Sequence, residues 1–149
     1  MNVFRGYDIR GIYGEELTDE LVYKIGLAFG EYFDNYETIG ILRDVRIHSE
    51  RIKNILTNSL LHTHNVIDFG IGSTPEAHYI AKVYSIPILM ITASHNPPQY
   101  NGIKPIKSNG DDLSSEELKR IEELTKNAKK PSEIIGKVEE ENAIELYKW

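Results

Sequence analysis

The fold is decided by one stretch of the second half of the chain, Ile86-Pro87-Ile88-Leu89-Met90-Ile91-Thr92-Ala93-Ser94-His95-Asn96-Pro97-Pro98. Its apolar first half is typical of a short buried strand, and the Pro pair prevents a simple continuation as strand or helix. A hydroxyl, an imidazole and a carboxamide therefore follow the end of a strand. Ligands bind at that edge of open α/β sheets. We expect Ser94 to carry the chemistry, as a phosphate carrier that the rest of the chain positions.

Strands and helices alternate along the remainder of the chain. Apolar spacing and capping residues predict helices over 18–34, 50–62 (capped by Ser49), 75–84 (capped by Thr74) and from Ser114 onward, and strands over 38–42, 65–69, 86–91 and 101–107. The internal Pro105 predicts that 101–107 is an edge strand. The alternation favours an α/β fold, a three-layer α/β/α sandwich around a mixed, mostly parallel four-stranded sheet.

The last part of the chain differs from the rest. Residues 1–135 are predicted to form one domain, whereas 136–149 are an acidic piece with a short helix over 140–148. We interpret 136–149 as a linker or the start of a missing second domain.

Composition excludes several classes of protein. The chain has 149 residues, 40% of them hydrophobic, a net charge of −6 and no Cys. This acidic balance argues against a nucleic-acid-binding module, and the absence of Cys excludes disulfides. No signal peptide is visible in residues 1–10, and no apolar run is long enough to cross a membrane. We therefore expect a cytoplasmic protein with no nucleic-acid or membrane partner.

Several basic residues lie in turn-rich segments rather than on amphipathic faces. Arg10, Arg43, Arg46 and Lys104 are the main examples, and they would form an anion site if their segments converge. Each also has a simpler interpretation. The two loop arginines could be solvated or paired with Asp44, and a lysine on an edge strand discourages unwanted pairing.

The Ser94-His95 pair has alternative interpretations too. A serine hydrolase would use such residues, but neighbours on a tight loop usually point apart, and the Gly-x-Ser-x-Gly elbow is absent. Ser94 and Asn96 could also simply cap a turn.

Four segments in order resemble one family, the α-D-phosphohexomutases. They are Phe4-Arg5-Gly6-Tyr7-Asp8-Ile9-Arg10-Gly11, Arg43-Asp44-x-Arg46, Thr92-Ala93-Ser94-His95-Asn96-Pro97 and Tyr100-Asn101-Gly102-Ile103-Lys104. The Tyr-Asp-Ile-Arg-Gly form is more similar to the phosphomannomutase/phosphoglucomutase branch than to the phosphoglucosamine mutases. The resemblance covers nearly the whole chain but only the first of the family's four domains.

The resemblance implies catalytic roles for four residues. Ser94 would be the phosphoserine, His95 would contact the sugar, Lys104 would be the general acid/base and Arg10 would lie on the phosphoserine. Leu42 replaces the usual Gly before the Arg-Asp pair.

Substrate and metal contacts are implied in the same way. Tyr7, Arg43, Arg46 and Asn101 would border the substrate or support its site. Mg²⁺ would be bound through the phosphate on Ser94, with its main ligands in a second domain that this sequence lacks. Glucose 1,6-bisphosphate or an equivalent would be the activator.

The implied function is phosphoryl transfer between O1 and O6 of a hexose phosphate. One domain cannot enclose a hexose, so we expect this chain to need the remaining domains of a mutase, or a complementing chain, and to be nearly inactive alone. The alternative is a stand-alone, non-catalytic module that binds phosphate or a phosphosugar.

Overall fold

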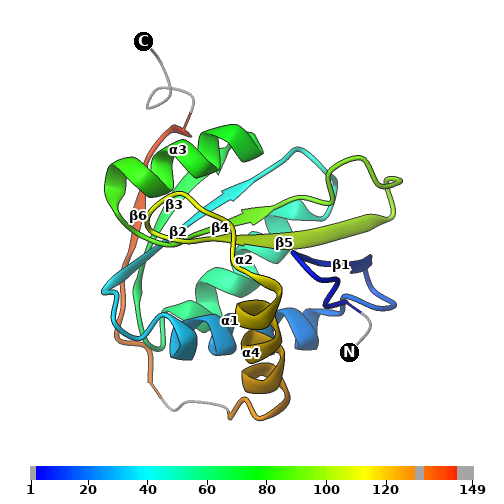
Figure 1. Ribbon diagram of the computed structural model, residues 1–149, viewed down its shortest axis with the longest axis horizontal. Coiled ribbons are helices and arrows are strands. Elements are labelled where there is room, and N and C mark those ends of the chain that lie inside the picture. Colours follow the sequence, from blue (N-terminus) through cyan, green and yellow to red (C-terminus); the bar gives the residue numbers. More distant parts are fainter. Residues whose placement is uncertain (1–2, 130–132, 144–149) are drawn as a thin grey trace.

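The computed structural model describes residues 3–129 and 133–143. Their elements form a six-stranded sheet with helices on both faces (Figure 1). In chain order they are β1 (Ile9–Ile12), α1 (Asp19–Tyr32), β2 (Thr38–Arg43), α2 (Ser49–Leu60), β3 (Asn65–Ile71), α3 (Thr74–Tyr84), β4 (Ile88–Ile91), β5 (Tyr100–Ile106), α4 (Ser115–Lys126) and β6 (Val138–Glu140).

The sheet is mixed and mostly parallel, in the order β1-β5-β4-β2-β3-β6. The strands β4, β2, β3 and β6 run parallel, and β5 is antiparallel to both of its neighbours. Every residue of β4 is buried, and so are the four central residues of β2. Strands covered on both faces need continuous apolar runs, which explains the sequence of both.

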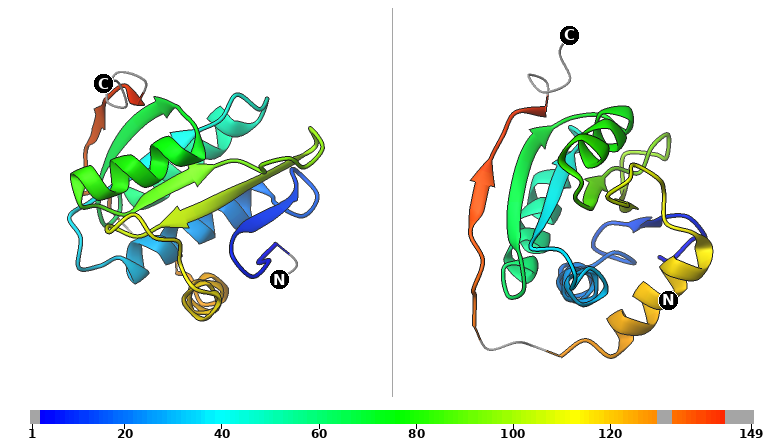
Figure 2. Two further views of the ribbon diagram at one scale, coloured as in Figure 1. Left: turned by 45° about the horizontal axis from the view of Figure 1, so that its top comes forward. Right: turned by 60° about the vertical axis from the view of Figure 1, so that its left-hand side comes forward.

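Three layers follow from the placement of the helices. Figure 2 shows α3 on one face of the sheet and α1, α2 and α4 on the other. Each face has its own buried cluster. Phe29, Ile52 and Ile121 belong to the cluster on the three-helix face, and Ile80 and Met90 to the cluster beneath α3. The predicted α/β sandwich is therefore confirmed.

Close contact between α1 and α2 depends on a glycine. A Cβ on Gly26 would lie 1.7 Å from Ser59 Oγ, so only glycine permits this approach. The two helices together cover one face of the central strands. The loops that follow β2 and β4 begin at the carboxyl ends of these strands.

The sheet has six strands rather than the four expected. The additional strands are the short β1, which pairs with β5, and β6, which pairs with β3. β5 is consequently an inner strand, and its prediction as an edge strand is wrong over 100–103, where β1 covers it. Pro105 is tolerated because it pairs only with Leu89 of β4, beyond the end of β1.

The segment after α4 joins the same sheet. Val138–Glu140 form β6, and Ala143 is fully buried in the cluster beneath α3. Part of the segment interpreted as a linker therefore packs on the domain. Of the helix expected over 140–148, Glu140 lies in β6, and 144–149 lie outside the described residues.

The helix caps differ from expectation at two places. The cap of α3 is Ser73, whose hydroxyl accepts a hydrogen bond from the Glu76 amide, and Thr74 is the first helical residue. In α2 the first residue is Ser49, whose side chain does not cap the helix because it bonds elsewhere. The caps predicted for α1 (Thr18) and α4 (Ser114) are present.

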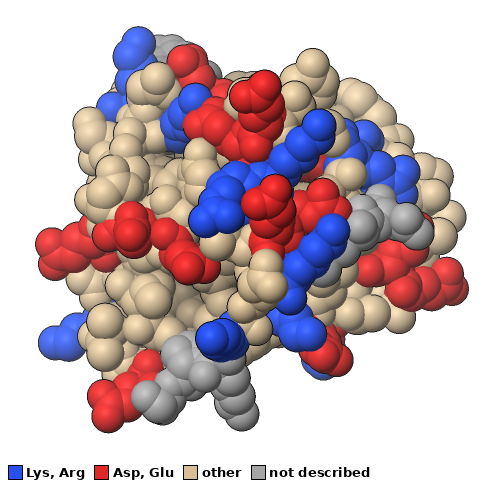
Figure 3. Space-filling model, turned by 60° about the horizontal axis from the view of Figure 1, so that its bottom comes forward, with Lys and Arg blue, Asp and Glu red and all other residues tan. Residues whose placement is uncertain are grey.

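The surface of the three-helix face carries both signs of charge. Figure 3 shows Lys and Arg interspersed with Asp and Glu there. Among the residues that the structure describes, no helix combines the length and the apolar character needed to span a bilayer.

Candidate functional site

The loop from Thr92 to Gln99, which we call the serine loop, connects β4 to β5. Ser94 and His95 are exposed on it, and Ser94 has a φ of 55°, in the left-handed region. Its amide donates to Thr92 Oγ1 at 3.0 Å, and Asn96 donates from its amide and its side chain to the Ala93 carbonyl. The loop thus presents the Ser94 side chain outward from the carboxyl end of β4.

A single arginine from the β2–α2 connection holds this loop. The Nη2 of Arg46 donates to the carbonyls of Ser94 at 2.7 Å and Asn96 at 2.8 Å. Its Nη1 donates to the carbonyls of Pro97 at 2.9 Å and Tyr100 at 3.2 Å. The planar guanidinium suits this task because its N–H groups form a rigid fork.

Asp44 holds Arg46 in turn. One carboxylate oxygen accepts from the Arg46 amide at 3.1 Å, and the other lies 3.3 Å from Arg46 Nε. The first oxygen also accepts from the hydroxyl of Ser49, which therefore serves this carboxylate instead of the helix cap. Behind Ser49, Asn101 of β5 donates to the same hydroxyl at 2.9 Å.

Arg10 and Lys104 lie on the α3 face of the sheet. Arg10 of β1 stands opposite Gly102 of β5, and Lys104 follows two residues later, so all three positions share one side. The pair of Lys104 on β4 is Met90, which packs beneath α3. Gly102 accepts a backbone hydrogen bond from Thr92 at the start of the serine loop.

Gly102 is required by the close approach of these segments. A Cβ there would lie 2.3 Å from the Ile9 carbonyl oxygen and 2.9 Å from Arg10 Cγ. The stem of Arg10 therefore passes directly over Gly102. The Arg10 Nε donates to Asp8 at 3.1 Å, which orients the guanidinium.

The Lys104 ammonium lies near a carboxylate in the turn before α4. Its Nζ lies 3.6 Å from Asp112 Oδ1, and the Nε2 of His78 lies 3.4 Å from the same oxygen. The other ring nitrogen of His78 is 2.7 Å from the Gly110 carbonyl. The carboxylate thus faces two basic groups, one from β5 and one from α3.

Other predicted site residues are placed differently. Arg43, at the end of β2, donates to the Asp44 carbonyl and lines a hollow beside β3 and β6 with Lys53 and Ile71. Tyr7 is 70% exposed on the loop before β1.

Asn101 is only 1% exposed, and its side-chain oxygen accepts from the Gly102 amide at 2.8 Å. Both ends of this amide are used inside the protein, so in this structure it does not face a substrate.

Sequence reasoning missed the links between these residues. The sequence predicts Asp44 as a partner of an arginine and Ser49 as a helix cap, whereas in the structure the two residues bond to each other. The spacing of Asp44, Arg46 and Ser49 is a usable signal, because all three follow one strand end within six residues.

The described residues contain no cluster of three or more His, Cys, Asp or Glu side chains that could hold a metal ion.

Comparison with known proteins gives one consistent family. Residues 1–132 match the family model described as phosphoglucomutase/phosphomannomutase, alpha/beta/alpha domain I. A probable phosphoglucosamine mutase of Pyrococcus abyssi is 40% identical over 144 residues, which cover 93% of this chain and 32% of that protein. A phosphoglucomutase/phosphomannomutase of Thermococcus kodakarensis is 39% identical over 128 residues, covering 82% of this chain and 28% of that protein.

A solved structure agrees. The putative phosphomannomutase of Thermus thermophilus superposes with a TM-score of 0.84 at 25% identity, over 97% of this chain and 34% of that one. The chain spans about a third of the length of these relatives, whose names include both branches of the family. From the family match over most of its length, and from the fold that carries it, the chain belongs to the phosphoglucomutase/phosphomannomutase family as its α/β/α domain I.

Proposed function

We propose that this chain is the phosphoserine domain of a phosphohexomutase and that Ser94 carries the transferred phosphate. The observation that supports this most directly is the exposed left-handed Ser94 on a loop that Arg46 holds by three of its backbone carbonyls and by the Tyr100 carbonyl of β5. A reactive hydroxyl held out at the carboxyl end of a strand is placed where α/β folds bind their ligands. The match of residues 1–132 to domain I of this family supports the proposal that the chain is such a domain.

Phosphoryl transfer depends on positioning and on neutralising charge more than on covalent help. A phosphate on Ser94 would add roughly −1.5 to −2 charge. Arg10, whose stem crosses Gly102, is the cation that we assign to it. The P–O bond to Ser94 would break as the oxygen of a sugar hydroxyl forms the new one. Lys104, as the neutral amine, would take up the proton that this hydroxyl loses and return it to the Ser94 oxygen. Transfer of the other phosphate of the sugar bisphosphate to Ser94 would reverse the phosphate transfer and the proton transfer.

The remaining predicted residues divide by exposure. His95 and Tyr7 are exposed and are proposed to contact the hexose phosphate. Arg46 and Asn101 are proposed to act through the loop rather than on the substrate, because their donors are used by protein groups. Arg43 is proposed to support the site from the end of β2, or to meet the substrate when further domains enclose it.

Mg²⁺ does not fit the side chains of this chain alone, because the described residues hold no suitable cluster. A phosphate on Ser94 would supply an oxygen ligand, and the other ligands are proposed to come from the second domain. Glucose 1,6-bisphosphate is proposed as the phosphate source that charges Ser94.

The complete enzyme is proposed to need more chain than is present here. Relatives are about three times longer, so we infer that the hexose is enclosed by their other domains and that the isolated domain turns over little or not at all. We propose that residues 1–135 are the phosphoserine domain and that 136–149, whose β6 adds to its sheet, lead into the next domain. We also propose a cytoplasmic location, as for an enzyme of hexose phosphate metabolism.

The test uses a chimera in which residues 1–132 replace domain I of the Thermococcus kodakarensis relative. With glucose 1-phosphate, glucose 1,6-bisphosphate and Mg²⁺, the chimera should turn over and gain the mass of one phosphate group. Ser94→Ala should abolish both, whereas Ser115→Ala, at an exposed serine of α4, should change neither. Turnover by the Ser94→Ala chimera would refute the proposal, and rapid labelling of Ser94 by a fluorophosphonate would favour a hydrolase instead.

A further inference from the structure

We propose that a polar relay sets the conformation of the serine loop and its position relative to Lys104. Its members are the buried Asn101 and Ser49 and the partly buried Asp44 and Arg46. Asn101, Ser49 and Asp44 are positioning residues, since none of them reaches the exposed side of the loop. The catalytic consequence rests on the proposed function of Ser94, whereas the ordering of the loop does not.

The direction of the hydrogen bonds in the relay is unambiguous. Ser49 is fully buried, and its hydroxyl accepts from Asn101 Nδ2 at 2.9 Å. A hydroxyl has one proton, so the proton of Ser49 is free to go to Asp44 Oδ1, which can only accept when ionised. The asparagine amide thus orients the hydroxyl, and the hydroxyl orients the carboxylate.

Asp44 passes this orientation on to the guanidinium. Its two oxygens engage the amide and the Nε of Arg46, and its own amide donates to the carbonyl of Ile91, the last residue of β4. Asp44 therefore fixes the orientation of the Arg46 guanidinium plane, independently of the loop. The other four N–H groups of Arg46 then donate to three carbonyls of the serine loop and to the carbonyl of Tyr100.

The loop needs this external constraint. Ser94 occupies a left-handed conformation that residues with a Cβ disfavour, and the described bonds within the loop come only from Thr92 and Asn96. Removing one member of a buried polar network leaves the others without partners, so the loss is larger than one hydrogen bond.

The same relay also fixes the strand that carries Lys104. Asn101 lies in β5, three residues before Lys104, and its side-chain oxygen accepts from the Gly102 amide. Arg46 further contacts the Tyr100 carbonyl, at the start of β5. The hydrogen bonds of the relay therefore connect both the loop that carries Ser94 and the strand that carries Lys104 to the segment between β2 and α2.

The chain offers a matched pair of variants for the test. Ser49 and Ser59 are both fully buried serines of α2 that donate their hydroxyl protons, but Ser59 donates to the Leu56 carbonyl, away from the loop. In the 149-residue chain, Ser49→Ala should speed amide hydrogen exchange across 93–100 by about tenfold. Ser59→Ala should leave that segment unchanged, whatever either variant does to the melting temperature.

A second variant approaches the relay from its other end. Asn101→Leu keeps the size and burial of the side chain but removes the donor to Ser49, and it should deprotect the same segment. If exchange over 93–100 is unchanged in both Ser49→Ala and Asn101→Leu, the relay does not set the loop and the inference is overturned.

The catalytic consequence is measured in the chimera described above. Ser49→Ala should lower kcat by about ten- to a hundredfold with KM for the sugar phosphate nearly unchanged, because misplacement affects transfer more than binding. Ser59→Ala should change neither constant. Faster loop exchange without a fall in kcat would overturn the catalytic part, while the structural part would stand. Failure of the proposed function itself is recognised separately, by turnover of the Ser94→Ala chimera.

Discussion

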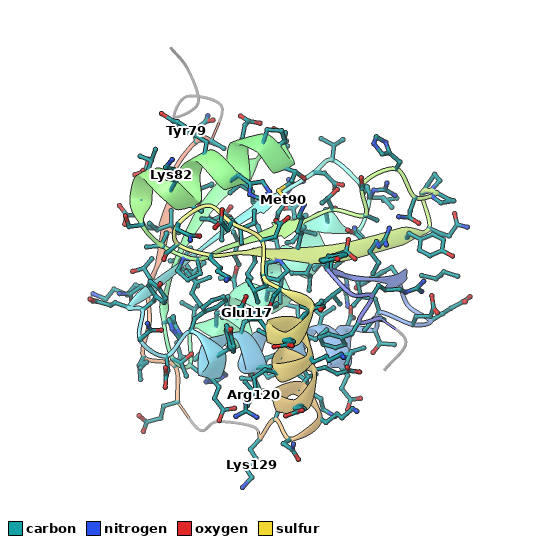
Figure 4. The ribbon with its side chains drawn as sticks, in the orientation of Figure 1. Tyr79, Lys82, Met90, Glu117, Arg120 and Lys129 are labelled. Atoms are coloured by element: carbon teal, nitrogen blue, oxygen red, sulfur yellow. The ribbon has the colours of Figure 1, made fainter. Side chains whose placement is uncertain are left out.

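Glu117, in the first turn of α4, makes the stability of this domain depend on pH. Its Oε1 accepts from the Lys107 ammonium at 2.7 Å and from the Ser114 amide at 2.9 Å. Its Oε2 accepts from the Tyr32 hydroxyl at 3.0 Å. In Figure 4 this side chain lies at the end of α4 nearest the sheet. Burial alone would raise the pKa of Glu117, but these hydrogen bonds outweigh it and lower the pKa from 4.5 to about 2.

The stability that follows can be calculated from this pKa. A pKa lowered from 4.5 to about 2 corresponds to about 3 kcal/mol at roughly 1.4 kcal/mol per pH unit. The Glu117 side chain is 28% exposed, so solvent screening reduces this to about 1–2 kcal/mol. Because the folded pKa is depressed, the stabilisation is fully present above pH 4.5 and is lost as the pH falls toward 2.

The variant Glu117→Gln isolates the charge, since glutamine can still accept the hydrogen bond from Ser114 that closes the capping box. Urea unfolding should show it about 1–2 kcal/mol less stable than the wild type at pH 7. The gap should shrink steadily between pH 4.5 and pH 2.

The matched control is Glu116→Gln, an exposed acid in the same helical turn. It removes the same interaction with the helix dipole but none of the three hydrogen bonds. A gap for Glu117→Gln that stays constant with pH, or that equals the gap for Glu116→Gln, would refute the reasoning.

Three further predictions follow from single contacts. In thermal melts, the free energy of unfolding of Ser94→Val should be about 1–2 kcal/mol lower than that of Ser94→Gly, because a β-branched residue is strained at a φ of 55°. Equal free energies would mean that the loop relaxes. Gly102→Ala should cost about 3 kcal/mol in urea unfolding, because the new methyl meets a backbone oxygen at 2.3 Å, and a loss near zero would contradict that packing. Tyr32→Phe should raise the pKa of Glu117, followed by carboxyl-carbon NMR, and an unchanged pKa would show that the phenol does not contribute.

The local elements were predictable because their signals are local. The helix predicted over 18–34 is Asp19–Tyr32, and the strand predicted over 38–42 is Thr38–Arg43. Apolar periodicity and a capping hydroxyl act within a few residues of each other, so they can be read along the chain. The strands β1 and β6 have only four and three residues, and their partners β5 and β3 lie far away in the sequence. Local patterns therefore do not show that these two strands join the sheet.

Some features of the candidate site were also predictable from the sequence, whereas others were not. The apolar run before Ser94, with Pro97 and Pro98 beyond it, predicts that a strand ends before Ser94, and the structure confirms this. The interior place of Asn101 was not predictable, because it depends on which side of β5 faces α2. Arg46 was expected near a phosphate or its loop, and only folding shows that its donors meet carbonyls.

The sequence by itself determined the order of the layers and the identity of the exposed serine, since hydrophobic period and chain-breaking residues act on neighbouring positions. Only the tertiary structure decided which groups hold that serine. Asn101, Ser49, Asp44 and Arg46 come from two segments separated by about 50 residues, and they meet because β2, β4 and β5 lie side by side in one sheet. Hydrogen bonds across such distances depend on strand order and register, which no single segment specifies.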